Sequence, residues 1–345
     1  MRALVVCGGA GALVVGAAGA GAGVVTGTGT VPLWGHTYGY RTWDVYQDPT
    51  VFIGVDPVEG SPRGMAFHNG SLYFVGAGSL IDTGPVRYAP GAAGDLSSPT
   101  TIRVPVQPSD PRRWLVPRSV AINTSGAGYG AFAGAEPVLT TVARDLVLST
   151  TNKSITLGVT GTTAAPGTPI DFSFTSPSAI EYAPSIDRFL STFIDINPSQ
   201  TTVSVHTHSA AGMTAVERSF TAMGGIHGMD IISGSFAGGL LGMQVSQAEV
   251  ILAFGHNDIG LSDPAFLAVY SLDGAAIGSV ANVPLSPLVN ASSIAVDEAS
   301  GNIYLGDRDT FTITVVHVPG PGAMGVGLAA LAGAVGRRRS RFSRS

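Results

Sequence analysis

One stretch near the C-terminus, residues 292–318, most constrains how this chain can fold. Residues 294–296 and 303–305 are short apolar runs, and residues 297–301 between them are rich in Asp, Ser and Gly. Asp and Ser can bond their own backbone, and Gly accepts a positive φ, so this composition is typical of a tight turn. A third run of β-branched residues covers 313–318. The stretch therefore predicts three short strands joined by tight turns.

Weaker copies of this unit recur upstream and make the chain a repeat protein. Their apolar openings start near Met65, Val120, Ile180, Met229 and Ile294, at spacings of 55, 60, 49 and 65 residues. Four-stranded propeller blades repeat about every 40–50 residues, which these spacings approach when loops are inserted. We expect an all-β fold, a single β-propeller over residues 34–318 with five blades, or six as the alternative.

A closed ring requires the two ends of the chain to share a blade. Residues 34–55 hold two aromatic and β-branched runs around Asp48 and Pro49, which predicts a hairpin. This hairpin and the three strands of residues 292–318 can complete one blade together. The rival fold is a pair of β-sandwich domains divided near residues 166–169.

Charge is scarce and unevenly placed along the chain. Charged residues make up 12% of the sequence, and 47 Gly and 22 Pro fit many short strands joined by turns. Six of the 18 Lys and Arg lie in the two ends, whereas none of the 23 Asp and Glu do. The body between the ends is therefore acidic, which argues against nucleic-acid binding, because that needs basic residues to displace phosphate counterions.

The first 22 residues have the layout of a secretory signal peptide. Arg2 precedes an apolar run, and small residues through position 22 offer small-x-small cleavage sites. Cys7 is the single cysteine, so no intramolecular disulfide can form, and it lies in the segment that we expect to be removed. We predict a signal peptide over 1–22 and a linker over 23–33.

The C-terminal residues 319–345 predict a sorting tail. An apolar segment, 322–336, would span about 22 Å as a helix, which is short against a hydrocarbon core of about 30 Å. It precedes an Arg-rich end, 337–345, that begins with Arg337, Arg338 and Arg339. The positive-inside rule would keep these arginines cytoplasmic and the body outside.

Two family resemblances extend these predictions. The tail, with Pro319 and Pro321 before a Gly/Ala/Leu helix and an Arg cluster, resembles the PEP-CTERM sorting signal of bacterial exosortase substrates, although Gly320 stands where that family has Glu. The resemblance implies processing near the prolines by a membrane sortase. Through residues 65–75 and 294–307 the body resembles propellers of the NHL and SMP-30/lactonase-like kind, which implies a divalent metal whose ligands we cannot place here.

Several polar groups are candidates for chemistry. His227 and Asp230 begin an inner strand, where propellers place ligands around the central channel, and they are our candidate ligand-binding residues. His206 and His208 alternate on a predicted strand, but a zinc site needs three or four ligands. The oxygen-rich stretch 256–263 could hold Ca²⁺, and ordinary turn chemistry is its alternative. We predict no catalytic residue and no cofactor, with Ca²⁺ as the one exception to consider.

These features together predict a function class and an address. We expect an exported cell-surface or extracellular-matrix protein whose propeller is a binding module. Its expected partners are the secretion machinery, a membrane sortase and the cytoplasmic membrane, with no nucleic acid. The alternative is a secreted metal-dependent hydrolase of the lactonase or esterase kind.

Overall fold

The computed structural model describes much of the body between the two predicted targeting segments. The described residues are 23–45, 62–75, 86–102, 115–123, 138–145, 152–160, 163–166, 170–172, 178–195, 200–209, 212–256, 264–285 and 291–319.

Within these residues, four antiparallel sheets are each built from one consecutive run of strands. The first holds β3 (Gly64–His68), β4 (Ser71–Val75), β5 (Val86–Tyr88) and β6 (Thr100–Thr101). The second holds β7 (Leu115–Asn123), β8 (Val138–Asp145), β9 (Asn152–Thr160) and β10 (Thr163–Pro166), with β11 (Ile170–Phe172) on β9. The third holds β12 (Ile180–Ala183), β13 (Arg188–Asp195), β14 (Gln200–Ser209) and β15 (Gly212–Met223). The fourth holds β16 (Gly225–Ser233), β17 (Glu249–His256), β18 (Ala265–Ser271) and β19 (Ala276–Val283).

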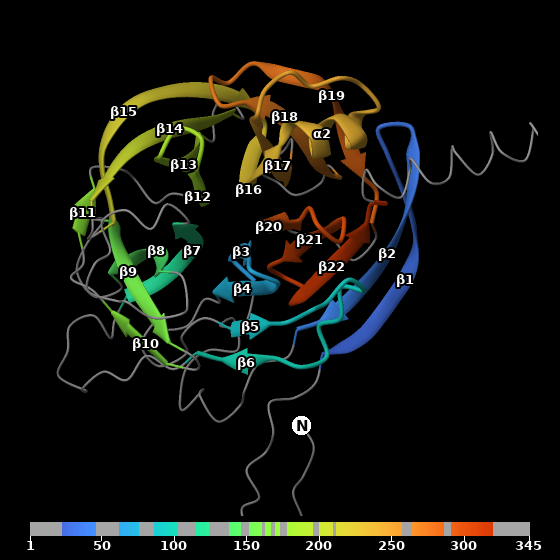
Figure 1. The fold of residues 1–345 in the computed structure, drawn as a ribbon, viewed down its shortest axis with the longest axis horizontal. Coiled ribbons are helices and arrows are strands. Elements are labelled where there is room, and N and C mark those ends of the chain that lie inside the picture. The colour runs from blue at the N-terminus through green and yellow to red at the C-terminus, as the bar shows by residue number, and fades with distance from the viewer. Residues whose placement is uncertain are drawn as a thin grey trace, which may run out of the picture.

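A further sheet, which we call the closing sheet, joins the two ends of the body. Its strand order is β1 (Val24–Leu33), β2 (His36–Asp44), β22 (Thr312–His317), β21 (Asn302–Asp307) and β20 (Ala291–Asp297). The junction is the β2–β22 ladder, which runs in register from Gly39 opposite His317 to Asp44 opposite Thr312. Figure 1 shows the blue N-terminal strands beside the red C-terminal ones.

The first strands of the sheets surround a common centre. Strands β3, β7, β12, β16 and β20 contact one another in cyclic order, and later strands lie progressively outward (Figure 1). Each apolar opening found in the sequence lies in one of these inner strands. The body is therefore a β-propeller, which the repeat pattern predicted.

The predicted fold class nevertheless needs correction. It expected a ring of five or six repeated blades and a C-terminal transmembrane helix. Among the described residues, four blades are each built from one consecutive run of strands, which corrects the predicted count of five or six. The two chain ends share the closing sheet, as was predicted for ring closure. No helix among the described residues is long and apolar enough to cross a membrane. The expected span, 322–336, lies outside those residues.

The hairpin turns obey local backbone chemistry. Asn69 and Gly70, both at positive φ, join β3 to β4 as the sequence indicated, because a two-residue type I′ turn requires positive φ twice. The same geometry at Trp34 and Gly35 joins β1 to β2, a hairpin that the sequence analysis did not predict. The turn predicted at Asp48 and Pro49 lies outside the described residues. Residues 24–33, predicted as a linker, form β1.

Among the described residues of the body, which the sequence predicted to be all-β, there is one helix, α2 (Gly234–Leu241). The Ser233 hydroxyl accepts a hydrogen bond from the Phe236 N–H and so caps the first turn, and Gly242 ends the helix in the left-handed conformation. Phe236 and Leu240 are buried. These caps and the packing of the apolar face offset the poor helix propensity of a Gly-rich segment.

Apolar clusters fill the spaces between neighbouring sheets. One cluster joins the closing sheet to the β16–β19 sheet and includes Val31, Val316 and Leu252. Another joins it to the β3–β6 sheet and includes Trp43 and Phe74. The closing sheet is therefore covered on both faces and is part of the core.

Close packing of the inner strands depends on missing side chains. A Cβ on Gly228 of β16 would lie 2.7 Å from the Ser293 Cα of β20, well inside normal contact. We predict that Gly228→Ala lowers the free energy of unfolding by about 1–3 kcal/mol through overpacking. The matched control is Gly39→Ala in β2, where a Cβ would meet nothing within 4 Å; its change should stay within about 0.5 kcal/mol. Urea unfolding of both variants measures the difference, and equal changes would contradict the packing argument.

Candidate functional site

Two buried carboxyls, Asp230 and Glu181, lie on inner strands, and the charge of Asp230 acts on Glu181. Asp230 of β16 accepts a hydrogen bond through Oδ2 from the Val296 N–H of β20 at 2.6 Å. Burial raises the pKa of Asp230 to about 7, although hydrogen bonds from the backbone N–H groups of Val296 and Ile231 act to lower it. Glu181 of β12 accepts a bond from the Tyr182 N–H at 2.9 Å, and its pKa is well above the ordinary value because of burial and then the charge of Asp230. Both carboxyls therefore bind a proton more tightly than an exposed carboxyl does.

His227 lies on the same strand as Asp230 but among different neighbours. It occupies a β-bulge of β16, and its ring centroid is 6.1 Å from that of His256. His256 Nε2 accepts a hydrogen bond from the Ala291 N–H at 2.7 Å, so this nitrogen carries no proton. Burial, then His256 and Arg308, lower the pKa of His227 to about 4. His227 and Asp230, which the sequence analysis paired, therefore lie in different surroundings. The His227 imidazole is neutral near pH 7, whereas the pKa of the Asp230 carboxyl is raised.

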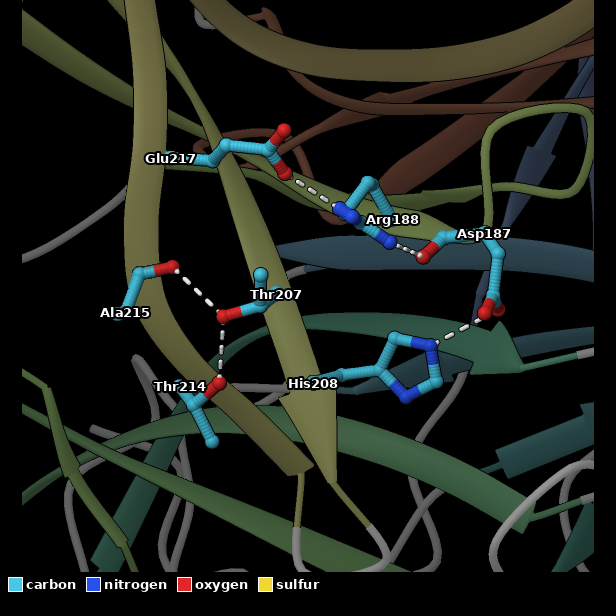
Figure 2. Close-up of polar contacts among 7 residues, drawn as sticks. All are labelled: Asp187, Arg188, Thr207, His208, Thr214, Ala215 and Glu217. Carbon is cyan, nitrogen blue, oxygen red and sulfur yellow. Dashed lines mark hydrogen bonds and ion pairs between the residues drawn. The ribbon is translucent and has the colours of Figure 1, made fainter.

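His206 and His208 of β14 bond separate partners. His206 Nε2 is 2.7 Å from the Ser191 hydroxyl, and His208 Nε2 is 2.9 Å from Asp187 Oδ1, which also accepts from the Tyr182 hydroxyl. Figure 2 shows His208 pointing to Asp187, with Thr207 pointing the other way toward β15. These contacts hold the β12–β13 turn against β14.

The part of the chain that the structure describes contains no cluster of side chains that could form a metal site. No group of three or more His, Cys, Asp or Glu there could hold an ion. The stretch predicted for Ca²⁺ falls mainly on residues 257–263, which lie outside the described residues. Of the predicted sorting residues, Pro319 is described and exposed. Gly320, Pro321, Arg337, Arg338 and Arg339 also lie outside.

A hollow of about 650 Å³ opens on the closing sheet, and we call it the closing-sheet pocket. The ladder places two rows of its lining side by side, since directly paired residues share one face of a sheet. One row is Thr30, Gly39, His317 and Asn302, and the other is Thr28, Arg41 and Val315. Ala92 and Ala93, in the turn before β6, form the opposite wall.

A hydrogen-bond network orients one side of the pocket. Asn302 Nδ2 donates to the Ala92 carbonyl at 3.2 Å, and it lies 2.9 Å from the Ser300 hydroxyl. This turns the Asn302 Oδ1 toward His317 Nδ1 at 3.0 Å. Because an amide oxygen only accepts, Nδ1 of His317 donates in this contact, and in the tautomer that leaves Nε2 without a proton Nε2 is an acceptor.

Positive charge dominates the other side. The Arg41 guanidinium is exposed beside Val315 and Thr28, and it always carries its charge. Asp95 lies within its electrostatic reach, and its pKa is lowered first by hydrogen bonds from Ser97 and then by Arg41. The pocket therefore combines the fixed cation of Arg41, the imidazole of His317 and two threonine hydroxyls.

Sequence reasoning singled out His227 and Asp230 but missed both Glu181 and the closing-sheet pocket. Glu181 left a signal, namely a charged residue inside the apolar opening of an inner strand. The predicted strands 303–305 and 313–318 lie beside or include Asn302 and His317, but the sequence analysis did not pair the two residues. No signal in the sequence pointed to Arg41, because Arg41 comes to lie beside these residues only through the pairing of β2 with β22.

Comparisons with known proteins found distant structural likenesses. No protein-family model and no curated protein matches the sequence. Similar solved structures include a nidogen/laminin complex (11% identity, 81% of this chain and 86% of that chain, TM-score 0.39). Others are the Pan2 WD40 domain of Neurospora crassa (11%, 85% and 89%, 0.39) and an exo-β-1,3-galactanase of Phanerochaete chrysosporium with galactose (11%, 75% and 59%, 0.47). Likeness at this level places no constraint on the activity of this chain.

Asp230 and His227 should affect the pH dependence of folding in opposite directions. The raised pKa of Asp230 keeps a proton on the folded state between pH 3.8 and about 7 that the unfolded state has released. This contribution lowers the free energy of unfolding as pH rises through that window. The lowered pKa of His227 leaves the folded state without a proton that the unfolded state binds between about 4 and 6.5. That contribution is lost as pH falls.

We predict that single substitutions separate the two contributions. In Asp230→Asn, the free energy of unfolding should rise with pH between about 4 and 6.5 more steeply than in the unsubstituted protein. In His227→Gln, it should fall more steeply over the same range. Urea unfolding at pH steps across this range measures both slopes. Profiles parallel to that of the unsubstituted protein would show that neither group titrates as the structure indicates.

Proposed function

We propose that this chain is an exported β-propeller binding module, delivered to the cell surface by its N-terminal signal and retained or released through its C-terminal tail. The propeller is the observed part of this proposal. The address rests on the signal-like residues 1–22 and on the PEP-CTERM-like residues 319–345.

The observation that carries the proposal is where the folded body ends. The last backbone bond of the ring runs from the Val318 N–H to the Gly301 carbonyl at 2.7 Å. Val318 is buried, whereas Pro319 is exposed. At the other end of the body, Gly23 is buried and leads directly into β1. Cleavage after the signal and near the prolines would therefore leave the closing sheet intact, which supports an address that is removable without unfolding the module.

The binding role is supported by the closing-sheet pocket. Its volume lies within the range of about 300–1,000 Å³ that is common for small-molecule sites. Polar groups from β1, β2, β21 and β22 converge on it. These features fit ligand capture by a preformed surface and require no covalent step.

Cell fractionation, with sequencing of both ends of the mature protein, tests the address. We predict a mature N-terminus near Gly23 and a C-terminus near residues 319–321, with the body outside the cytoplasm. Replacing Arg337, Arg338 and Arg339 together with Ser should reduce membrane retention, because these cations hold the tail end inside. Arg308→Ser, in the body, is the matched control and should leave retention unchanged. Intact protein in the cytoplasm would overturn the proposed address.

A further inference from the structure

We propose that the closing-sheet pocket binds a small sugar acid, that is, a compact molecule that carries a carboxylate and neighbouring hydroxyls. The inference rests on the binding role proposed above and not on the proposed export. It assigns the class of ligand from the groups that line the hollow.

The carboxylate follows from Arg41. Its guanidinium presents a planar fork of N–H donors, which matches the two oxygens of a carboxylate. The residue is exposed at the pocket, so a ligand can reach it without displacing core packing. The ladder partner of Arg41 on one side is Thr28 and on the other is Val315. An anionic group at this position therefore has a charged donor with a hydroxyl beside it.

The hydroxyls follow from the other row of the pocket. Asn302 orients the His317 ring by accepting from Nδ1, and in this tautomer Nε2 is free to accept a hydrogen bond from a ligand hydroxyl. An acceptor next to a fixed cation selects a ligand that donates a hydrogen bond as well as carrying a negative charge. Thr28 and Thr30, two residues apart on β1, add hydroxyls that donate or accept. The hydroxyls of a polyol can hydrogen-bond to these donors and acceptors, whereas a simple anion would leave the acceptors bonded to water.

The floor sets the size and shape of the ligand. Gly39 lies between Thr30 and His317 in the ladder, and a Cβ there would meet nothing within 4 Å. The space above this strand is therefore open because the side chain is absent. The volume of about 650 Å³ accommodates a monosaccharide.

Titration calorimetry of the full-length protein in detergent tests the ligand class with three probes. D-glucuronate has both groups, D-glucose lacks the carboxylate, and acetate lacks the hydroxyls. We expect D-glucuronate to bind and the other two to bind roughly tenfold more weakly or worse, since each loses one set of charge-assisted or neutral bonds. Equal affinity for acetate would reduce the site to a simple carboxylate site and overturn the inference. Equal affinity for D-glucose would show that Arg41 does not bind a carboxylate, which would also overturn the inference.

Variants locate the binding. Arg41→Ala and His317→Ala should each weaken D-glucuronate binding by roughly tenfold. Gly39→Leu should abolish it by filling the hollow while keeping the side chains of Arg41 and His317. Arg218→Ala, which removes an exposed ion pair with Asp273 on the β14–β15 side, is the matched control and should bind normally. Normal binding by Gly39→Leu would place the site elsewhere and overturn the inference.

The outcome is separable from that of the proposed address. Exported protein that fails to bind D-glucuronate overturns the ligand and leaves the address standing. Cytoplasmic protein that binds it through Arg41 overturns the address and leaves the ligand standing.

Discussion

The β2–β22 ladder is the interaction on which the rest of this structure depends. It pairs strands from opposite ends of the body, and the Thr42 and Thr314 hydroxyls meet within it at 3.0 Å, both buried. Closing so long a loop costs chain entropy, which the adjoining apolar clusters offset. Because those clusters lie on both faces of the closing sheet, opening the ladder would expose core on two sides. No covalent bond can replace it, since Cys7 is the single cysteine.

Closure also explains why the pocket lies where it does. Neither chain end carries the whole lining: Arg41 and Gly39 come from β2, whereas His317 comes from β22. The pocket exists only when the ring is shut, so a ligand that bridges these strands would favour the closed state. The inner strands have a different role. Their glycines and paired backbone bonds set the spacing of the sheets, and their buried acids make folding sensitive to pH.

Much of the architecture was readable from local chemistry. The apolar openings predicted the inner strands, and Asn69 with Gly70 predicted a hairpin, because positive φ is a strictly local requirement. Three features were not readable. β1 is rich in Thr and Gly and gains its strand structure by pairing with β2. α2 depends on caps at Ser233 and Gly242 more than on propensity. Ring closure predicted that the two chain ends share a sheet, but the pairing of β2 with β22 and the pocket on it depend on contacts between residues more than 250 positions apart, such as Thr42 and Thr314, which no local pattern records.

Hydrogen–deuterium exchange with and without D-glucuronate tests most directly whether the closing sheet is both the lock of the ring and the ligand site. The account predicts slower exchange of the amides of β2 and β22, because a ligand bound across the ladder opposes its opening. Amides of the β12–β15 sheet, on the far side of the ring, should change little. Protection that appears around the inner strands, or nowhere on β2 and β22, would contradict the account.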